Sequence, residues 1–188
     1  MISRLSKCIS EYLCKMNVIP LEDRELYAYG FFLLLSRGIF LVTTALIGAI
    51  LGIFWESVLF YTIFSLLREY AGGVHASKET VCLICTILMM SLGVISIRLF
   101  ENEKCIGIAL VLLLVGSVIV YFLSPLDSEN KPLTSSERQY YGKKTRRIVE
   151  ILVLSALILM PVKNSVLLYI IAVTLILEGA LLILAKII

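Results

Sequence analysis

Long apolar segments separated by short polar stretches dominate this chain. A helix needs about 20 apolar residues to span a bilayer. Six apolar segments of different lengths follow a more polar beginning, at positions 28–54, 57–67, 81–99, 106–123, 148–160 and 165–185. The pattern predicts an all-α polytopic integral membrane protein with about six helical segments.

The segments differ in length, and so in how they can cross a membrane. The third, fourth and sixth fit a single span. The first, 28–54, is long enough to tilt or to bend near Arg37-Gly38. The second, 57–67, is short, so it must extend into residues 68–73 or remain a partial helix covered by protein. The fifth is also short.

Residues 2–16 follow a helical pattern of a different kind. Apolar residues recur at three- and four-residue spacing and form one stripe: Ile2, Leu5, Ile9, Leu13 and Met16. The pattern predicts an amphipathic helix that is too polar to span and lies at the membrane interface. Packing as a cap on the other helices is the alternative. We expect one membrane-embedded domain, with this helix and a linker at 1–24 and a helical bundle at 28–185.

Composition supports the membrane class and narrows the chemistry. The 188 residues are 60% hydrophobic and carry a formal net charge of +3, which indicates a protein of the cell membrane. No basic face interleaved with aromatic residues indicates nucleic-acid binding. The five cysteines are odd in number and there is one histidine. Neither a disulfide framework nor a metal site is therefore indicated, and no cofactor is required.

The distribution of Lys and Arg predicts the orientation. With the N-terminus inside, most of them lie in inner loops: Arg68, Lys78, Lys131, Arg138, Lys143, Lys144, Arg146 and Arg147. The outer turns hold few, and this asymmetry follows the positive-inside rule. Six segments then place both termini in the cytoplasm. The polar loop expected at 124–147 would contact anionic lipid.

The sole histidine, His75, and Cys82 lie where a glycine turn meets the start of an apolar helix. A base beside a thiol is the arrangement that a cysteine nucleophile needs. On one straight helix, residues seven apart lie about 10.5 Å apart along the axis, which is too far for a hydrogen bond of about 3 Å. Gly72-Gly73 offers a solution, because it breaks the preceding helix and lets the loop with His75 fold back. Both groups would face the cytoplasm.

Neighbouring residues favour a thiolate at Cys82. Ser77 is a good N-cap and Glu79 suits a first helical turn, so we expect the helix to begin near Ser77. Lys78, one turn before Cys82, and the positive end of the helix would both favour the charged thiolate. The plain alternatives are an interfacial histidine and a cysteine that acts as a small hydrophobic residue.

One block, followed by Cys82, resembles the signature of the AgrB (accessory gene regulator B) family of Gram-positive quorum sensing: Arg68-Glu69-Tyr70-Ala71-Gly72-Gly73-Val74-His75-Ala76. The stretch 124–133 is similar to the family's proline-rich cytoplasmic loop. The length, the number of segments and the amphipathic start also match. The resemblance therefore covers nearly the whole chain.

The resemblance implies a membrane cysteine endopeptidase. Such an enzyme cleaves the C-terminal part from a small amphipathic precursor peptide and helps close the remainder into a cyclic thiolactone or lactone pheromone. It implies His75 and Cys82 as the catalytic pair, and a homodimer. A third catalytic residue stays open among three candidates: Glu79, Glu69 and Asn130. Backbone N–H groups near Gly72-Gly73 could hold the oxyanion.

Two other functions stay open. Cys82 and Cys85 form a C-x-x-C pair, which is typical of a thiol–disulfide oxidoreductase. Against that function stand the cytoplasmic side, where thiols stay reduced, and the lack of a second pair outside. Arg37 and Glu178 lie in apolar stretches and could mark the path of a non-catalytic carrier. An ion pair or an interfacial position explains them equally well.

Overall fold

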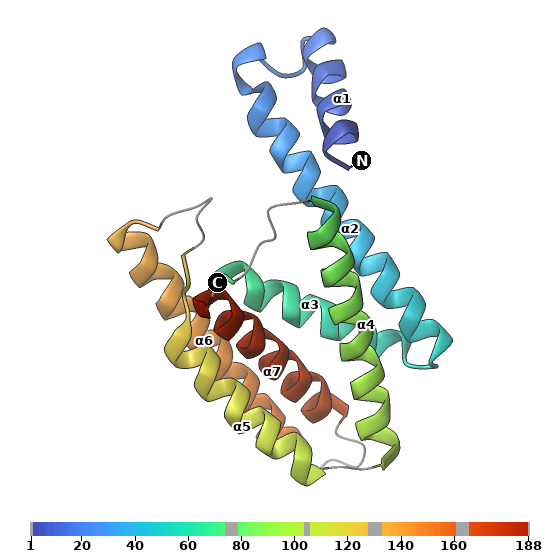
Figure 1. The fold of residues 1–188 in the computed structure, drawn as a ribbon, viewed down its shortest axis with the longest axis vertical. Helices are drawn as coiled ribbons and strands as arrows, with labels where there is room; N and C mark the ends of the chain where they lie inside the picture. The colour runs from blue at the N-terminus through green and yellow to red at the C-terminus, as the bar shows by residue number, and fades with distance from the viewer. Residues whose placement is uncertain (1, 74–78, 104–105, 128–132, 161–165, 188) are drawn as a thin grey trace. The chain divides into compact units, whose positions relative to one another are not determined.

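A computed structural model describes residues 2–73, 79–103, 106–127, 133–160 and 166–187, and these residues form an all-helical fold (Figure 1). One short 3-10 helix, Leu21–Asp23, precedes the second α-helix. The α-helices are α1 (Ile2–Lys15), α2 (Arg24–Ile50), α3 (Phe54–Ala71), α4 (Glu79–Glu103), α5 (Ile106–Leu123), α6 (Ser135–Leu159) and α7 (Val166–Ile187). The predicted all-α class is confirmed.

Among the described residues, 4 helices are long and apolar enough to cross a membrane. They cover Leu21–Ile50, Glu79–Glu101, Ile106–Leu123 and Val166–Ile187. The helices of the second and fifth predicted segments are not among them: α3 carries Glu56, Arg68 and Glu69, and the first half of α6 is polar. The membrane character is supported, while the count of about six segments stays a prediction.

The first two predicted segments have different boundaries in the structure. Helix α2 runs without interruption through Arg37-Gly38, and a tilt or bend of this segment stays a prediction. It ends before Gly52, whose φ of 74° turns the chain, and the predicted end at position 54 is therefore wrong. Helix α3 continues past the predicted end at 67 to Ala71. The short segment thus extends into the residues that follow it.

Helix α6 begins inside the stretch expected to be a polar loop at 124–147. Thr134 caps the helix: its side chain accepts from the Glu137 backbone N–H, and the Glu137 carboxylate accepts from the Thr134 backbone N–H at 3.0 Å. This reciprocal capping box satisfies two backbone donors at the helix start. The expectation of a loop was wrong from Ser135 onward. The T-x-x-E spacing was the available signal.

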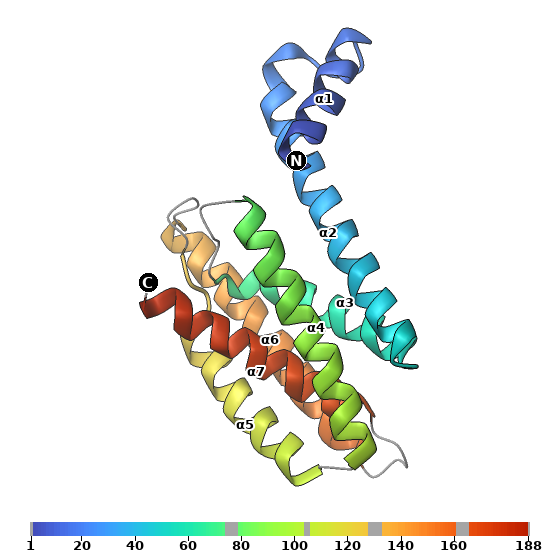
Figure 2. The same ribbon diagram turned by 45° about the vertical axis from the view of Figure 1, so that its right-hand side comes forward.

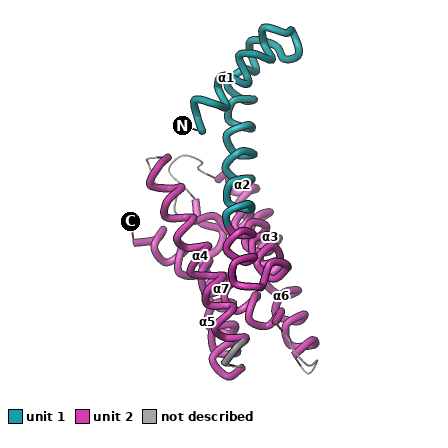
Figure 3. The backbone as a smooth tube through the Cα atoms, turned by 90° about the vertical axis from the view of Figure 1, so that its right-hand side faces the viewer, with its two compact units in different colours: residues 1–43 teal, residues 44–188 magenta. Residues whose placement is uncertain are grey.

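The chain divides within α2 into two compact units, residues 1–43 and 44–188 (Figure 3). In the first unit α1 lies beside the beginning of α2 (Figures 1 and 2). Its buried side chains are Ile2, Ser6, Ser10 and Cys14. Of the predicted apolar stripe, Leu5 and Met16 are instead 52% and 60% exposed. The placement of α1 at the membrane interface stays a prediction.

In the second unit α7 is the central helix and packs against α3, α4, α5 and α6. In its apolar window 61% of the residues are buried, against 22% for α4 and for α5. Helices α5 and α7 approach closely at Gly116, where an added Cβ would lie 2.7 Å from the Ile176 backbone nitrogen. Small residues at such contacts are typical of membrane helix packing.

Candidate active site

The turn after α3 is built from two glycines. Gly72 has φ 82° and ψ −155°, and Gly73 has φ 128°. Only a residue without a Cβ adopts such angles at low cost. The Gly72 N–H donates to the Arg68 carbonyl at 3.3 Å and closes the last turn of α3. The predicted break of the helix at Gly72-Gly73 is confirmed.

This glycine turn packs against the segment that follows α5. The Leu126 N–H donates to the Ala71 carbonyl at 3.1 Å, and Gly72 and Leu126 form an isolated parallel bridge. A Cβ on Gly72 would lie 2.3 Å from the Leu126 carbonyl oxygen. The described parts of the two sequence blocks that resemble the family, 68–73 and 124–127, therefore meet in space at this turn.

Arg68 approaches the same turn from the α3 side. Its Nη1 donates to the Gly72 carbonyl at 3.1 Å and lies 3.7 Å from Oε1 of Glu178 on α7. The Arg68 side chain is 20% exposed and the Glu178 side chain is fully buried. The ion-pair explanation of Glu178 is thus the one that the structure supports. Its partner, Arg68, is 110 positions away, and no sequence pattern connects the two.

Cys82 lies at the beginning of α4, three residues after Glu79, and its side chain is half-buried. Cys85, one turn later, is exposed, and both cysteines are free thiols. Glu79 is half-buried in the first turn of α4, whereas Glu69 is exposed near the end of α3. The remaining predicted site residues lie outside the described residues: His75, Lys78 and Asn130. The pairing of His75 with Cys82 therefore stays a prediction.

An aromatic and basic cluster lies beside the turn. Nζ of Lys144 is 3.4 Å from the Tyr70 hydroxyl and lies over two rings, 4.7 Å from the centre of Tyr70 and 4.9 Å from that of Tyr140. Tyr141 packs on Tyr70 with ring centres 6.0 Å apart. Hydrogen bonding with Tyr140, and then with Tyr70, raises the pKa of Lys144 above its usual 10.5. Lys144 therefore stays charged, and links α3 to α6.

Asp127 and Arg138 join the same region. They form an ion pair between the segment after α5 and the first turns of α6. Gly142, one turn later, is buried, and a Cβ there would lie 3.2 Å from Cδ of Pro125. The beginning of α6 is thus packed onto the 124–127 segment that supports the glycine turn.

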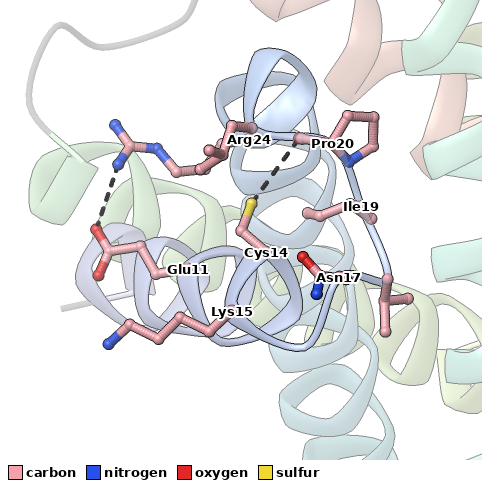
Figure 4. Close-up of a pocket in the computed structure, with 9 residues that line it drawn as sticks. Glu11, Cys14, Lys15, Asn17, Ile19, Pro20 and Arg24 are labelled. Atoms are coloured by element: carbon pink, nitrogen blue, oxygen red, sulfur yellow. Dashed lines mark hydrogen bonds and ion pairs between the residues drawn. The ribbon is translucent and has the colours of Figure 1, made fainter.

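A separate hollow of about 790 Å³ lies in the first unit, at the connection between α1 and α2 (Figure 4). Glu11 pairs with Arg24 at 4.0 Å across it, and the Cys14 thiol donates to the Pro20 carbonyl at 3.9 Å. None of the predicted site residues lines this hollow. Among the described residues, no group of three His, Cys, Asp or Glu side chains could hold a metal ion.

Comparison with known proteins points to one family. A family model described as accessory gene regulator B matches residues 6–183. An AgrB-like protein of Clostridium perfringens strain SM101 is 30% identical over 149 residues, which are 77% of this chain and 70% of that protein. An AgrB-like protein of Clostridium acetobutylicum is 25% identical over 149 residues, 78% of this chain and 68% of that protein. No solved structure matches.

Proposed function

The chain belongs to the accessory gene regulator B family, and from that premise we propose that it is a membrane cysteine endopeptidase with Cys82 as nucleophile and His75 as base. Family membership implies a role in the accessory gene regulator quorum-sensing system. The substrate of this chain is a small amphipathic precursor peptide. The enzyme removes its C-terminal part and closes the remainder into a thiolactone or lactone.

The observation that carries this proposal is the glycine turn between α3 and the helix of Cys82. The turn uses backbone angles that favour glycine at both Gly72 and Gly73. It is held on one side by Leu126 and on the other by Arg68. Backbone angles of this sparsely populated kind, fixed by their surroundings, are common at catalytic sites. The turn leads into His75 two residues later, and Cys82 follows at the start of α4.

The reaction needs only acyl transfer. The Cys82 thiolate attacks the carbonyl carbon of the scissile peptide bond, and His75 holds the thiol proton. The C–N bond breaks, His75 protonates the leaving amine, and the precursor remains bound to Cys82 as a thioester. A cysteine or serine of the same peptide then attacks the thioester and regenerates the Cys82 thiol. Because one acyl bond replaces another at each step, the reaction requires no oxidant or cofactor.

Water is the competitor for the thioester, so a site at the membrane surface favours ring closure. We place the site on the cytoplasmic side, where the positive-inside rule puts the beginning of α6. The basic residues there, together with anionic lipid, would hold an acidic part of the precursor near the turn. A homodimer is part of the proposal on the strength of the family alone.

The test is cleavage of the cognate precursor by the full-length protein in proteoliposomes. Cys82→Ala and His75→Ala should each abolish cleavage while expression and membrane insertion persist. Cys85→Ala is the matched control, because Cys85 is an exposed free thiol one turn away. It should retain most of the activity.

The oxidoreductase alternative predicts instead that Cys82 and Cys85 are both required for activity. If Cys85→Ala is as inactive as Cys82→Ala, and if activity follows the redox state of the pair, the peptidase proposal is wrong. Cleavage that persists in Cys82→Ala would contradict it directly.

A further inference from the structure

Glu178 is a fully buried carboxylate in a largely apolar helix. Its side chain is 0% exposed, and neither carboxylate oxygen accepts a hydrogen bond from any described residue. A buried charge without full compensation is costly, and within a membrane span it marks a functional role by default. The peptidase proposal gives Glu178 no role so far.

Among the described residues, Glu178 forms an ion pair with Arg68, in the last turn of α3. Nη1 of Arg68 lies 3.7 Å from Oε1 of Glu178, and the same nitrogen donates to the Gly72 carbonyl at 3.1 Å. An arginine has a long side chain with several rotamers, and an ion pair restricts them. Glu178 therefore holds the guanidinium at the place where it meets the glycine turn.

The contact between the guanidinium and the turn is close. A Cβ on Gly73 would lie 2.0 Å from Nη1, 2.9 Å from Cζ and 3.3 Å from Nη2 of Arg68. The backbone at Gly73 thus passes directly over the guanidinium. On its other side the turn meets the Leu126 backbone, which would be 2.3 Å from a Cβ on Gly72. The turn is held from two sides, and one side depends on Arg68.

We propose that Glu178 is a positioning residue of the peptidase: through Arg68 it fixes the Gly72-Gly73 turn and so the point from which the chain enters the segment carrying His75. The inference rests on the proposed function, in which His75 must meet Cys82. Glu178 touches neither the substrate nor the reacting atoms. It acts from the last helix of the chain on the geometry of the pair.

A simpler role for the same contact is to hold α3 against α7. The two roles differ in what they require of position 68. Helix packing needs only opposite charges at 68 and 178, in either order. Positioning of the turn needs a hydrogen-bond donor at 68, because the Gly72 carbonyl is an acceptor. The reversed pair Arg68→Glu/Glu178→Arg separates the two roles, since it restores the ion pair without the donor.

The experiment measures single-turnover cleavage of the cognate precursor by full-length protein in proteoliposomes. We expect Glu178→Gln to lower the cleavage rate constant by about 10- to 100-fold, the loss expected from a small displacement of a catalytic group. KM for the precursor should stay within about twofold. Glu150→Gln, an exposed glutamate on α6, is the matched control and should cleave at the wild-type rate. The reversed pair should remain as slow as Glu178→Gln.

A second readout does not depend on turnover. In a protein whose other four cysteines are serine, the pH dependence of Cys82 alkylation by iodoacetamide reports the base beside the thiol. We expect Glu178→Gln to move this profile to higher pH, because His75 is no longer held near Cys82. The double variant Arg68→Met/Glu178→Gln has no unpaired buried charge and no hydrogen-bond donor at position 68. It should give the same slow cleavage and shifted profile even if Glu178→Gln alone folds poorly.

Any one of three results would overturn the positioning role. These are cleavage at the wild-type rate by Glu178→Gln, recovery of cleavage in the reversed pair, and an unshifted alkylation profile in the double variant. Failure of the underlying function shows elsewhere, as cleavage by Cys82→Ala. Failure of the positioning role and failure of the peptidase function are therefore detected with different variants.

Discussion

Replacement of Gly72 by alanine tests how the turn is held. Its φ of 82° and ψ of −155° lie in a region that is essentially confined to glycine, and an alanine there costs roughly 1–3 kcal/mol. The new Cβ would also lie 2.3 Å from the Leu126 carbonyl oxygen. That atom belongs to the backbone, so it cannot rotate away. The bridge must open, with the loss of the bond from the Leu126 N–H to the Ala71 carbonyl, worth about 0.5–1.5 kcal/mol.

Together these terms favour a different turn by about 3 kcal/mol, which lowers the population of the active turn roughly a hundredfold. Single-turnover cleavage of the precursor by Gly72→Ala should fall by about that factor, while membrane insertion stays normal because the apolar helices are untouched. Substrate should still bind, since its apolar contacts lie elsewhere. Co-purification of the precursor with the variant tests whether substrate still binds.

Gly52→Ala is the matched control for this prediction. Gly52 also has a positive φ, 74°, but an added Cβ there meets no atom within 4 Å. An alanine at position 52 therefore has the same kind of backbone strain as one at position 72, but it collides with no neighbouring atom and lies in a different turn. We expect Gly52→Ala to cleave within about threefold of wild type, since its strain of roughly 1–3 kcal/mol affects another part of the chain. Cleavage by Gly72→Ala at the same rate as Gly52→Ala would refute the account of the turn.

Three further predictions concern packing, topology and charge. Gly116→Leu should lower the thermal midpoint of the purified protein by several degrees, because overpacking costs about 1–3 kcal/mol. The control Gly107→Leu should leave the midpoint unchanged, because a Cβ there meets nothing within 4 Å. Equal midpoints for the two variants would contradict the α5–α7 contact. Single cysteines in place of Lys143 and Lys163 should be labelled from opposite sides of the membrane, and labelling from one side would rule out the six-segment count. The pKa of Lys144 is raised above 10.5, its value in the unfolded chain. Its stabilising charge is therefore fully present below pH 10.5 and is lost only as the pH rises through the higher pKa of the folded state. Lys144→Gln should therefore change the cleavage rate by one constant factor between about pH 6 and about pH 9, and a factor that varies with pH would contradict it.

Local features of the sequence determined the helices and the break at the site. Helix α5 has the same bounds as the predicted segment 106–123, because a run of apolar residues of span length has one favourable state in a membrane. Gly72-Gly73 predicted the end of α3, because backbone freedom is a property of the residue itself. The capping box at Thr134 was equally local, and its spacing could have predicted the start of α6.

The tertiary structure alone decided which of these features meet. Arg68 and Glu178 were both visible as charges beside or within apolar sequence, but their pairing depends on how α3 packs on α7. The same holds for the bridge between Gly72 and Leu126, and for Lys144 and Tyr70, which are 74 positions apart. Periodicity and turn chemistry act over one or two helical turns, whereas the contacts that hold the candidate site join residues brought together only by helix packing.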